Sequence, residues 1–178
     1  MFTNTFILFF LISSSLFGYV FETNPINNKI DQFKKQLLGT RTISNKIFRD
    51  QVFNKKDFKN YKFENVEFIH CNFNATNFRN SKFNKVVFKN CTIYNSDFRL
   101  TLIKFSKFIK SEIKFSYFNN AKLHFIDFIY SKLPGTSFVQ ATLHNCRFIK
   151  SDLSSAIWPN GKKCMKGSFE KCIFVQKR

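Results

Sequence analysis

Acidic residues are scarce in this 178-residue chain, which has 11 Asp and Glu against 29 Lys and Arg and a formal net charge of +18. A surplus of this size favours anionic partners such as nucleic acid, lipid headgroups or acidic glycans, and it opposes any role that requires looking like DNA. The alternative is a solvated surface without a partner, because net charge alone does not say where the charges lie. The length allows one ordinary domain or a short repeat array.

Residue arrangements typical of catalysis are missing as well. No Ser–His–Asp order, carboxylate pair, glycine-rich phosphate loop or zinc signature stands above chance. His124 and His144 are twenty residues apart, a spacing that places them side by side in the fold predicted below. No third ligand is evident, and Lys104, twenty residues earlier, adds a cation, so a metal site is disfavoured. We therefore expect a protein that is not an enzyme and that has no cofactor.

Basic residues are also absent ahead of the first apolar run, which spans residues 5–21 (TFILFFLISSSLFGYVF). The run has about the length of a signal-peptide core, although no clean small-x-small cleavage site follows it. It predicts a signal peptide over residues 1–21 and a periplasmic or secreted protein. If the run is not a signal, the protein is cytoplasmic or anchored in a membrane.

A large apolar residue recurs at every fifth position from Ile43 to Leu153, a period that fits neither a helix nor a strand. Every second one of these centres is phenylalanine: Phe48, Phe58, Phe68, Phe78, Phe88, Phe98, Phe108, Phe118, Phe128, Phe138 and Phe148. The residue two places before each centre is mostly small from Cys71 onward. Period ten within period five means that successive units are not equivalent, as expected if a coil of twenty residues has two opposite faces reserved for Phe, stacked at the ~4.8 Å spacing of paired strands.

Segments such as Ser96-Asp97-Phe98, Ala121-Lys122-Leu123 and Ser151-Asp152-Leu153 resemble the unit of the pentapeptide repeat family over residues 41–157. The resemblance implies an all-β solenoid, a right-handed quadrilateral β-helix in which four pentapeptides make one coil. Such solenoids gain stability from neighbour contacts and need caps at their ends. Cys71 and Cys91, one coil apart at inward positions, are expected to be buried thiols, although their separation also permits a disulfide.

Both ends of the repeats carry candidate caps. Residues 22–40 are expected to form a linker and a short α-helical cap, because Ile30, Phe33 and Leu37 fall on one helical face. Residues 158–178 resemble the C-terminal tail of many bacterial members of the family, with a Trp, a turn ending in Gly and two Cys. That resemblance makes a Cys164–Cys172 disulfide plausible, which would close a short loop under the last coil.

Residues twenty apart should stack on one outer face, which gives two candidate surfaces. The first is a basic stripe that could bind anionic groups on a polymer: Lys59, Lys62, Arg79, Lys82, Arg99 and Lys122. The alternative is that these long side chains splay into water and block edge association. The second is an apolar contact patch for a protein partner or a second copy, unless a terminal segment packs there: Ile69, Phe105, Ile109, Phe125, Ile129 and Ile149.

The sequence thus predicts a non-catalytic, exported solenoid that serves as an interaction scaffold. Its partner would be an anionic polymer, a lipid surface or another protein, with a homodimer also possible and no specific nucleic acid expected. Family resemblance suggests an alternative, since some pentapeptide repeat proteins mimic the DNA duplex and act on DNA gyrase. The positive charge and the apparent signal depart from that mechanism, and a secreted effector acting on a host cell is a further alternative.

Overall fold

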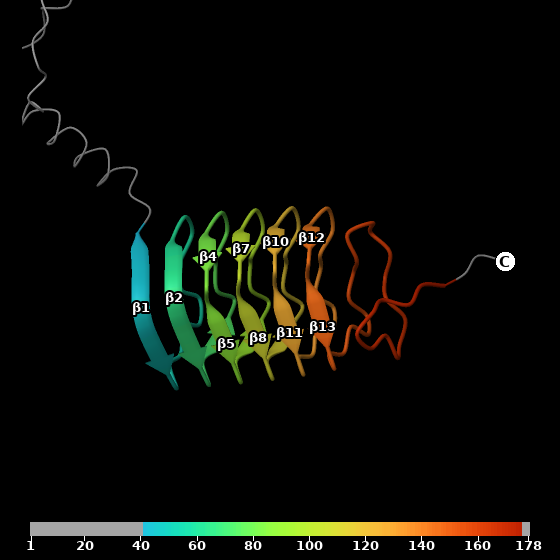
Figure 1. Cartoon of the computed structure of the whole chain (residues 1–178), viewed down its shortest axis with the longest axis horizontal. Helices are drawn as coiled ribbons and strands as arrows, with labels where there is room; N and C mark the ends of the chain where they lie inside the picture. The colour runs from blue at the N-terminus through green and yellow to red at the C-terminus, as the bar shows by residue number, and fades with distance from the viewer. Residues whose placement is uncertain (1–40, 176–178) are drawn as a thin grey trace, which may run out of the picture. The chain divides into compact units, whose positions relative to one another are not determined.

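The computed structural model describes residues 41–175, so the predicted signal peptide (1–21) and N-terminal helical cap (22–40) lie outside the described residues. The described part is a β-solenoid built from short parallel strands (Figure 1). Strand partners differ by twenty residues throughout, as in Phe63 beside Phe83 and Phe68 beside Phe88. The predicted four-sided β-solenoid of 20-residue coils is therefore confirmed.

Two long strands begin the solenoid, β1 (Thr42–Arg49) and β2 (Lys62–Ile69), and each continues around one corner. The strands on the face that we call the β4 face are β4 (Lys82–Asn84), β7 (Leu102–Lys104), β10 (Lys122–His124) and β12 (Thr142–His144). Those on the next face, the β5 face, are β5 (Val87–Lys89), β8 (Lys107–Ile109), β11 (Asp127–Ile129) and β13 (Arg147–Ile149). One sheet runs β12-β10-β7-β4-β2-β5-β8-β11-β13, with β1 paired to β2, so both rows meet at β2 (Figure 1).

The other two faces are less regular. The third, which we call the β3 face, carries a three-stranded sheet of β3 (Asn72–Asn74), β6 (Thr92–Tyr94) and β9 (Glu112–Lys114). The fourth, which we call the bridge face, has only isolated parallel bridges that step from Asp57 through Asn77, Asp97, Tyr117 and Ser137 to Ile157. Four walls therefore surround one interior.

Aromatic ladders fill that interior, as the sequence predicts. On the β5 face the rings from Phe48 to Phe148 stack at centroid separations of 5.3, 5.0, 4.8, 4.9 and 4.8 Å. On the opposite, bridge face the rings from Phe58 to Phe138 stack at 5.4, 4.7, 4.6 and 5.2 Å, and Trp158 contacts the last of them. Each ring is thus held by its neighbours above and below, and interior rings such as Phe98 are fully buried.

Every corner of the tube requires a residue with positive φ, two places after each centre. The chain uses Asn most often there, as at Asn65, Asn80 and Asn95 with φ of 52°, 59° and 49°. Asn tolerates this left-handed conformation better than other residues with a side chain, apart from Asp. The corners therefore explain much of the asparagine content of the sequence.

Hydroxyl groups at the small inward positions connect successive coils. Ser96 Oγ donates to the Phe73 carbonyl at 2.6 Å and accepts from the Thr76 amide at 3.2 Å, one coil earlier. Ser131 and Ser151 repeat this arrangement in later coils. Small size is thus only part of the requirement at these positions, because the hydroxyl also satisfies buried backbone groups.

Alanine occupies an inward position where the backbone amide one coil earlier already has a carbonyl acceptor. Ala121 follows Thr101, whose amide already donates to the Phe98 carbonyl within its own turn at 3.3 Å. Ala156 follows Thr136, whose amide donates to the Leu133 carbonyl at 3.2 Å. Alanine therefore occurs where the amide one coil earlier already has an acceptor in its own turn, and Ser81 shows that serine occurs after such an amide as well.

The C-terminal tail closes the last coil. Its backbone accepts hydrogen bonds from Leu153 and Ser155, through the carbonyls of Ser168 and Cys164 at 2.8 and 3.1 Å. The structure pairs Cys164 with Cys172 in a disulfide, while Cys71 and Cys91 are buried free thiols. The tail thus supplies partners that a further coil would otherwise provide.

Candidate functional site

The predicted basic stripe lies along the corner between the bridge face and the β4 face. Lys59, Arg79 and Arg99 leave the bridge face, and the amides of Asn60 and Asn80 donate to the Arg79 and Arg99 carbonyls one coil later. Across that corner Lys62 pairs with Lys82 in register, and Leu102 separates Lys82 from Lys122. The stripe is therefore continuous on the bridge face and interrupted once on the β4 face.

Two of its six cations have acidic partners. Arg99 Nη2 lies 2.6 Å from Asp97 Oδ2, and Lys62 Nζ lies 2.9 Å from Glu64 Oε1. Partial burial opposes ionisation of Asp97, but hydrogen bonds from Arg99 and its positive charge hold the pKa of Asp97 below its usual value.

The other four cations are exposed and make no ion pair among residues 41–175: Lys59, Arg79, Lys82 and Lys122. Asn60 and Asn80 lie between the two rows, with Asn80 Nδ2 donating to Asn60 Oδ1 at 2.8 Å. This corner therefore offers positive charge beside fixed amide groups, a combination suited to anionic oxygen atoms.

The predicted apolar patch is assembled only in part. Phe105 and Phe125 are exposed and stack with ring centroids 5.2 Å apart. Ile109, Ile129 and Ile149 are half-buried in one column of the β5 face. Ile69 is buried, and its register neighbours are Arg49 and Lys89.

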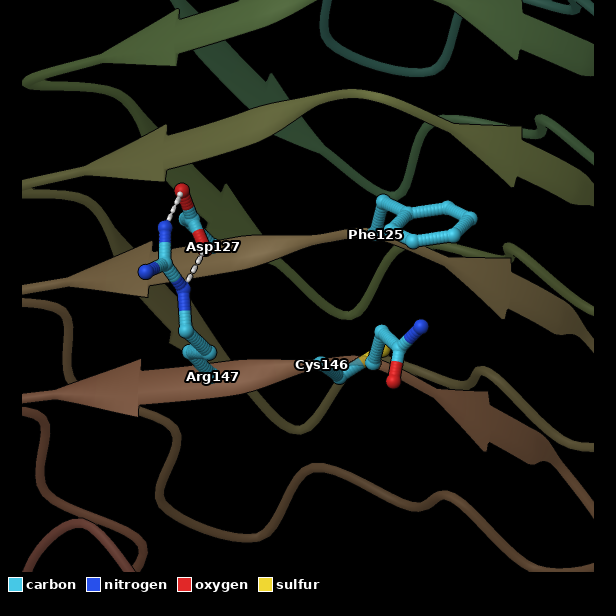
Figure 2. Close-up of a pocket in the computed structure, with 5 residues that line it drawn as sticks. Phe125, Asp127, Cys146 and Arg147 are labelled. Carbon is cyan, nitrogen blue, oxygen red and sulfur yellow. Dashed lines mark hydrogen bonds and ion pairs between the residues drawn. The ribbon is translucent and has the colours of Figure 1, made fainter.

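A shallow recess of about 510 Å³ adjoins this patch and is lined by Phe125, Asp127, Asn145, Cys146 and Arg147. Figure 2 shows the Arg147 guanidinium facing the Asp127 carboxylate across adjacent strands, at 2.7 and 2.8 Å. Hydrogen bonds from Arg147 lower the pKa of Asp127, so the pair stays ionised. Burial raises the pKa of the Cys146 thiol to about 11, which makes it a poor nucleophile at neutral pH.

His124 and His144 are in register on adjacent coils, as the sequence predicts, with ring centroids 5.6 Å apart and an angle of 52° between the ring planes. Desolvation and the nearby charges of His144, Lys104 and Lys122 lower the pKa of His124. Within residues 41–175 no group of three or more His, Cys, Asp and Glu residues could hold a metal ion. No helix among these residues is long and apolar enough to cross a membrane.

Family comparisons match most of the sequence in two parts. Residues 27–118 match the model of the SV2A/B/C luminal domain, and residues 121–157 match the model of pentapeptide repeats. No curated protein matches the chain at a significant level.

Solved structures resemble the solenoid at low sequence identity. A pentapeptide repeat protein, Rfr23, from the cyanobacterium Cyanothece is 13% identical over 74% of this chain and 99% of its own, with a TM-score of 0.51. QnrB1, a plasmid-mediated fluoroquinolone resistance protein, is 17% identical over 67% of this chain and 70% of its own, with a TM-score of 0.37. A thylakoid lumen protein from Arabidopsis thaliana is 13% identical over 68% of this chain and 71% of its own, with a TM-score of 0.32. At these identities the similarity concerns the fold alone.

Proposed function

The chain belongs to the pentapeptide repeat family, and from this premise we propose that it is a non-catalytic scaffold whose basic corner binds an anionic partner. The observation that carries the proposal is the group of four exposed cations along that corner that make no ion pair with any other residue between 41 and 175. Two of them, Arg79 and Lys82, flank the Asn80 corner of a single coil.

Solenoid geometry favours an extended partner. Successive coils repeat at about the ~4.8 Å spacing of paired strands, so each cation is close to the next one along the axis. Like charges at this spacing repel unless they are solvated or share anions between them. A polymer or surface with many anionic groups relieves that repulsion over several coils, whereas a single small anion relieves it at one coil only.

Binding to an anionic polymer, measured against salt, tests the proposal. Retention on immobilised heparin should fall steeply as the salt concentration rises. Salt screens the attraction between the cations and the polymer, and it reduces the gain from counterions released on binding. Arg79→Gln/Lys82→Gln should elute at lower salt than the parent protein. The matched control, Lys110→Gln/Lys132→Gln, removes the same charge from other exposed positions and should have a smaller effect. Equal elution of the two variants would show that net charge, and not the basic corner, governs retention.

We also propose an extracytoplasmic location. The apolar run at residues 5–21 supports it, and so does the match of residues 27–118 to a family described as a luminal domain. Cell fractionation with N-terminal sequencing of the mature product tests this directly. An intact N-terminus on a cytoplasmic product would contradict it. A DNA-mimicking role is disfavoured by the net charge of +18.

A further inference from the structure

Two exposed phenylalanines occupy corner positions that suit them poorly. Phe105 and Phe125 have φ of 50° and 58° and exposed fractions of 53% and 46%. A bulky residue at positive φ is an outlier, and an exposed aromatic ring gains little from folding. In the same column of corners the chain uses Asn at positions 45, 65 and 145. Packing of the solenoid therefore does not require phenylalanine at these two corners, and the exposed rings there are a candidate contact surface.

The β4 face beside these rings carries lysines among neutral residues such as Leu102 and Thr142, and Glu64 of the adjoining strand β2 pairs with Lys62. The face contributes Lys82, Lys104 and Lys122, all exposed, and no acidic residue occurs in β4, β7, β10 or β12. Phe105 directly follows β7 and Phe125 directly follows β10, so the two rings line one edge of this face. The opposite edge is the basic corner described above. The result is a row of short strands with cations across it and aromatic rings along one side.

We propose that the β4 face binds the surface of a membrane rich in anionic lipid, with the lysines against the headgroups and the two rings inserted at its edge. This inference rests on the proposed function and names the partner as a lipid surface. Lysines near an anionic membrane each strengthen binding by about fivefold, from the ~1 kcal/mol that each contributes. Aromatic rings at an edge enter the boundary between headgroups and acyl chains, as they do in interfacial helices.

The geometry of the rings favours lipid over nucleic acid or glycan. The rings of Phe105 and Phe125 stack face to face, so each ring covers one face of the other, with an angle of 13° between their planes. His144 meets the remaining side of Phe125 in an edge arrangement, at a centroid distance of 5.6 Å and an angle of 90°. Bases stack on open ring faces, which Phe125 does not offer. Ring edges remain exposed, and an apolar phase accepts them without any stacking partner.

Vesicle co-sedimentation of the full chain tests the inference, using phosphatidylcholine with and without phosphatidylserine. The parent protein should bind only the anionic vesicles and should dissociate at high salt. Lys82→Gln/Lys104→Gln/Lys122→Gln should weaken binding on the order of a hundredfold by the same per-lysine estimate. The matched control, Lys89→Gln/Lys110→Gln/Lys132→Gln, changes three exposed lysines on other parts of the solenoid and should weaken it far less.

Replacement of the rings separates a binding role from a structural one. Phe105→Asn/Phe125→Asn should weaken vesicle binding about tenfold or more, while the urea midpoint stays the same or rises, because Asn suits a corner with positive φ. Phe115→Asn, at an exposed aromatic corner away from the β4 face with φ of 49°, is the control and should leave binding unchanged. A loss of stability together with binding, or no change in binding, would overturn the inference.

Parallel heparin chromatography distinguishes failure of this inference from failure of the proposed function. Heparin binding without vesicle binding would leave the anionic partner in place and exclude the lipid surface. Loss of both would refute the two proposals together. A concentration-dependent dimer in analytical ultracentrifugation, abolished by Phe105→Asn/Phe125→Asn, would assign the rings to a second copy and so overturn the membrane inference.

Discussion

A serine at an inward position should contribute more to the free energy of unfolding where the backbone amide one coil earlier has no other acceptor. Ser96 and Ser81 are comparable, because both are fully buried and both donate to a carbonyl one coil earlier at 2.6 Å, although Ser96 Oγ also lies 3.1 Å from the Tyr94 carbonyl. They differ in the amide they accept from. Within residues 41–175 the Thr76 amide has Ser96 Oγ as its acceptor. The Tyr61 amide instead donates to two acceptors, Ser81 Oγ and the Phe58 carbonyl.

Magnitudes follow from that difference. Ser81→Ala removes a hydrogen bond but leaves the Tyr61 amide with an acceptor, so the free energy of unfolding should fall by about 1 kcal/mol. Ser96→Ala removes the same kind of bond and also leaves the buried Thr76 amide unsatisfied, which costs about 1–3 kcal/mol. The total for Ser96→Ala should therefore be about 2–4 kcal/mol.

Urea unfolding followed by the fluorescence of the single Trp158 and by circular dichroism measures both values. Coincident transitions are the control, because repeat proteins can lose cooperativity. Hydrogen exchange at the Thr76 amide gives an independent measure and should accelerate in Ser96→Ala alone. Equal losses of stability, within about 0.5 kcal/mol, would refute the proposed role of the hydroxyls.

Three further predictions concern single features. Gly135→Ala should cost about 1–2 kcal/mol in thermal unfolding, because φ is +65° and a Cβ would lie 2.5 Å from Phe115 Cδ1; Phe115→Ala should restore only the part due to that contact, and full restoration would contradict a conformational cost. Reduction of the Cys164–Cys172 disulfide should lower stability by about 2–3 kcal/mol, and a Cys164→Ser/Cys172→Ser variant insensitive to reductant is the control. The lowered pKa of Asp127 stabilises the fold above the unfolded value near ~3.9, and this contribution is lost as pH falls through the folded pKa. Asp127→Asn should therefore flatten the acid limb of stability against pH, and an unchanged limb would exclude the Arg147 pair as its source.

The interior of the solenoid could be predicted from sequence because one rule repeats over the whole array. The centre at every fifth place follows from the period, and the twenty-residue spacing between stacked rings follows from the four units per coil that the family resemblance implies, as pairs such as Phe88 and Phe108 confirm. The same logic placed the basic residues of the stripe in columns, since register follows from counting.

Other features could not be predicted because they depend on side-chain conformation, which the repeat does not fix. Arg99 forms an ion pair with Asp97, and Lys62 forms one with Glu64. Each pair depends on the conformations of two side chains, which the sequence does not give. Ile69 is outward by position, yet it is buried, unlike Ile109 and Ile129 in the same column. The requirement for positive φ at corners gave a signal, namely the frequent Asn two places after each centre, which periodic hydrophobicity alone does not interpret.

Because each coil has twenty residues, five on each face, the length of an insertion decides which face later residues occupy. An insertion of twenty residues adds one coil and leaves every later side chain on its original face. An insertion of five residues keeps each apolar centre inside but rotates everything after it by a quarter turn. Lys122 of β10 would then leave the wall of β4 and β7, and one surface would become two fragments that face different directions. Natural variation in length should therefore come in whole coils wherever one wall carries the function.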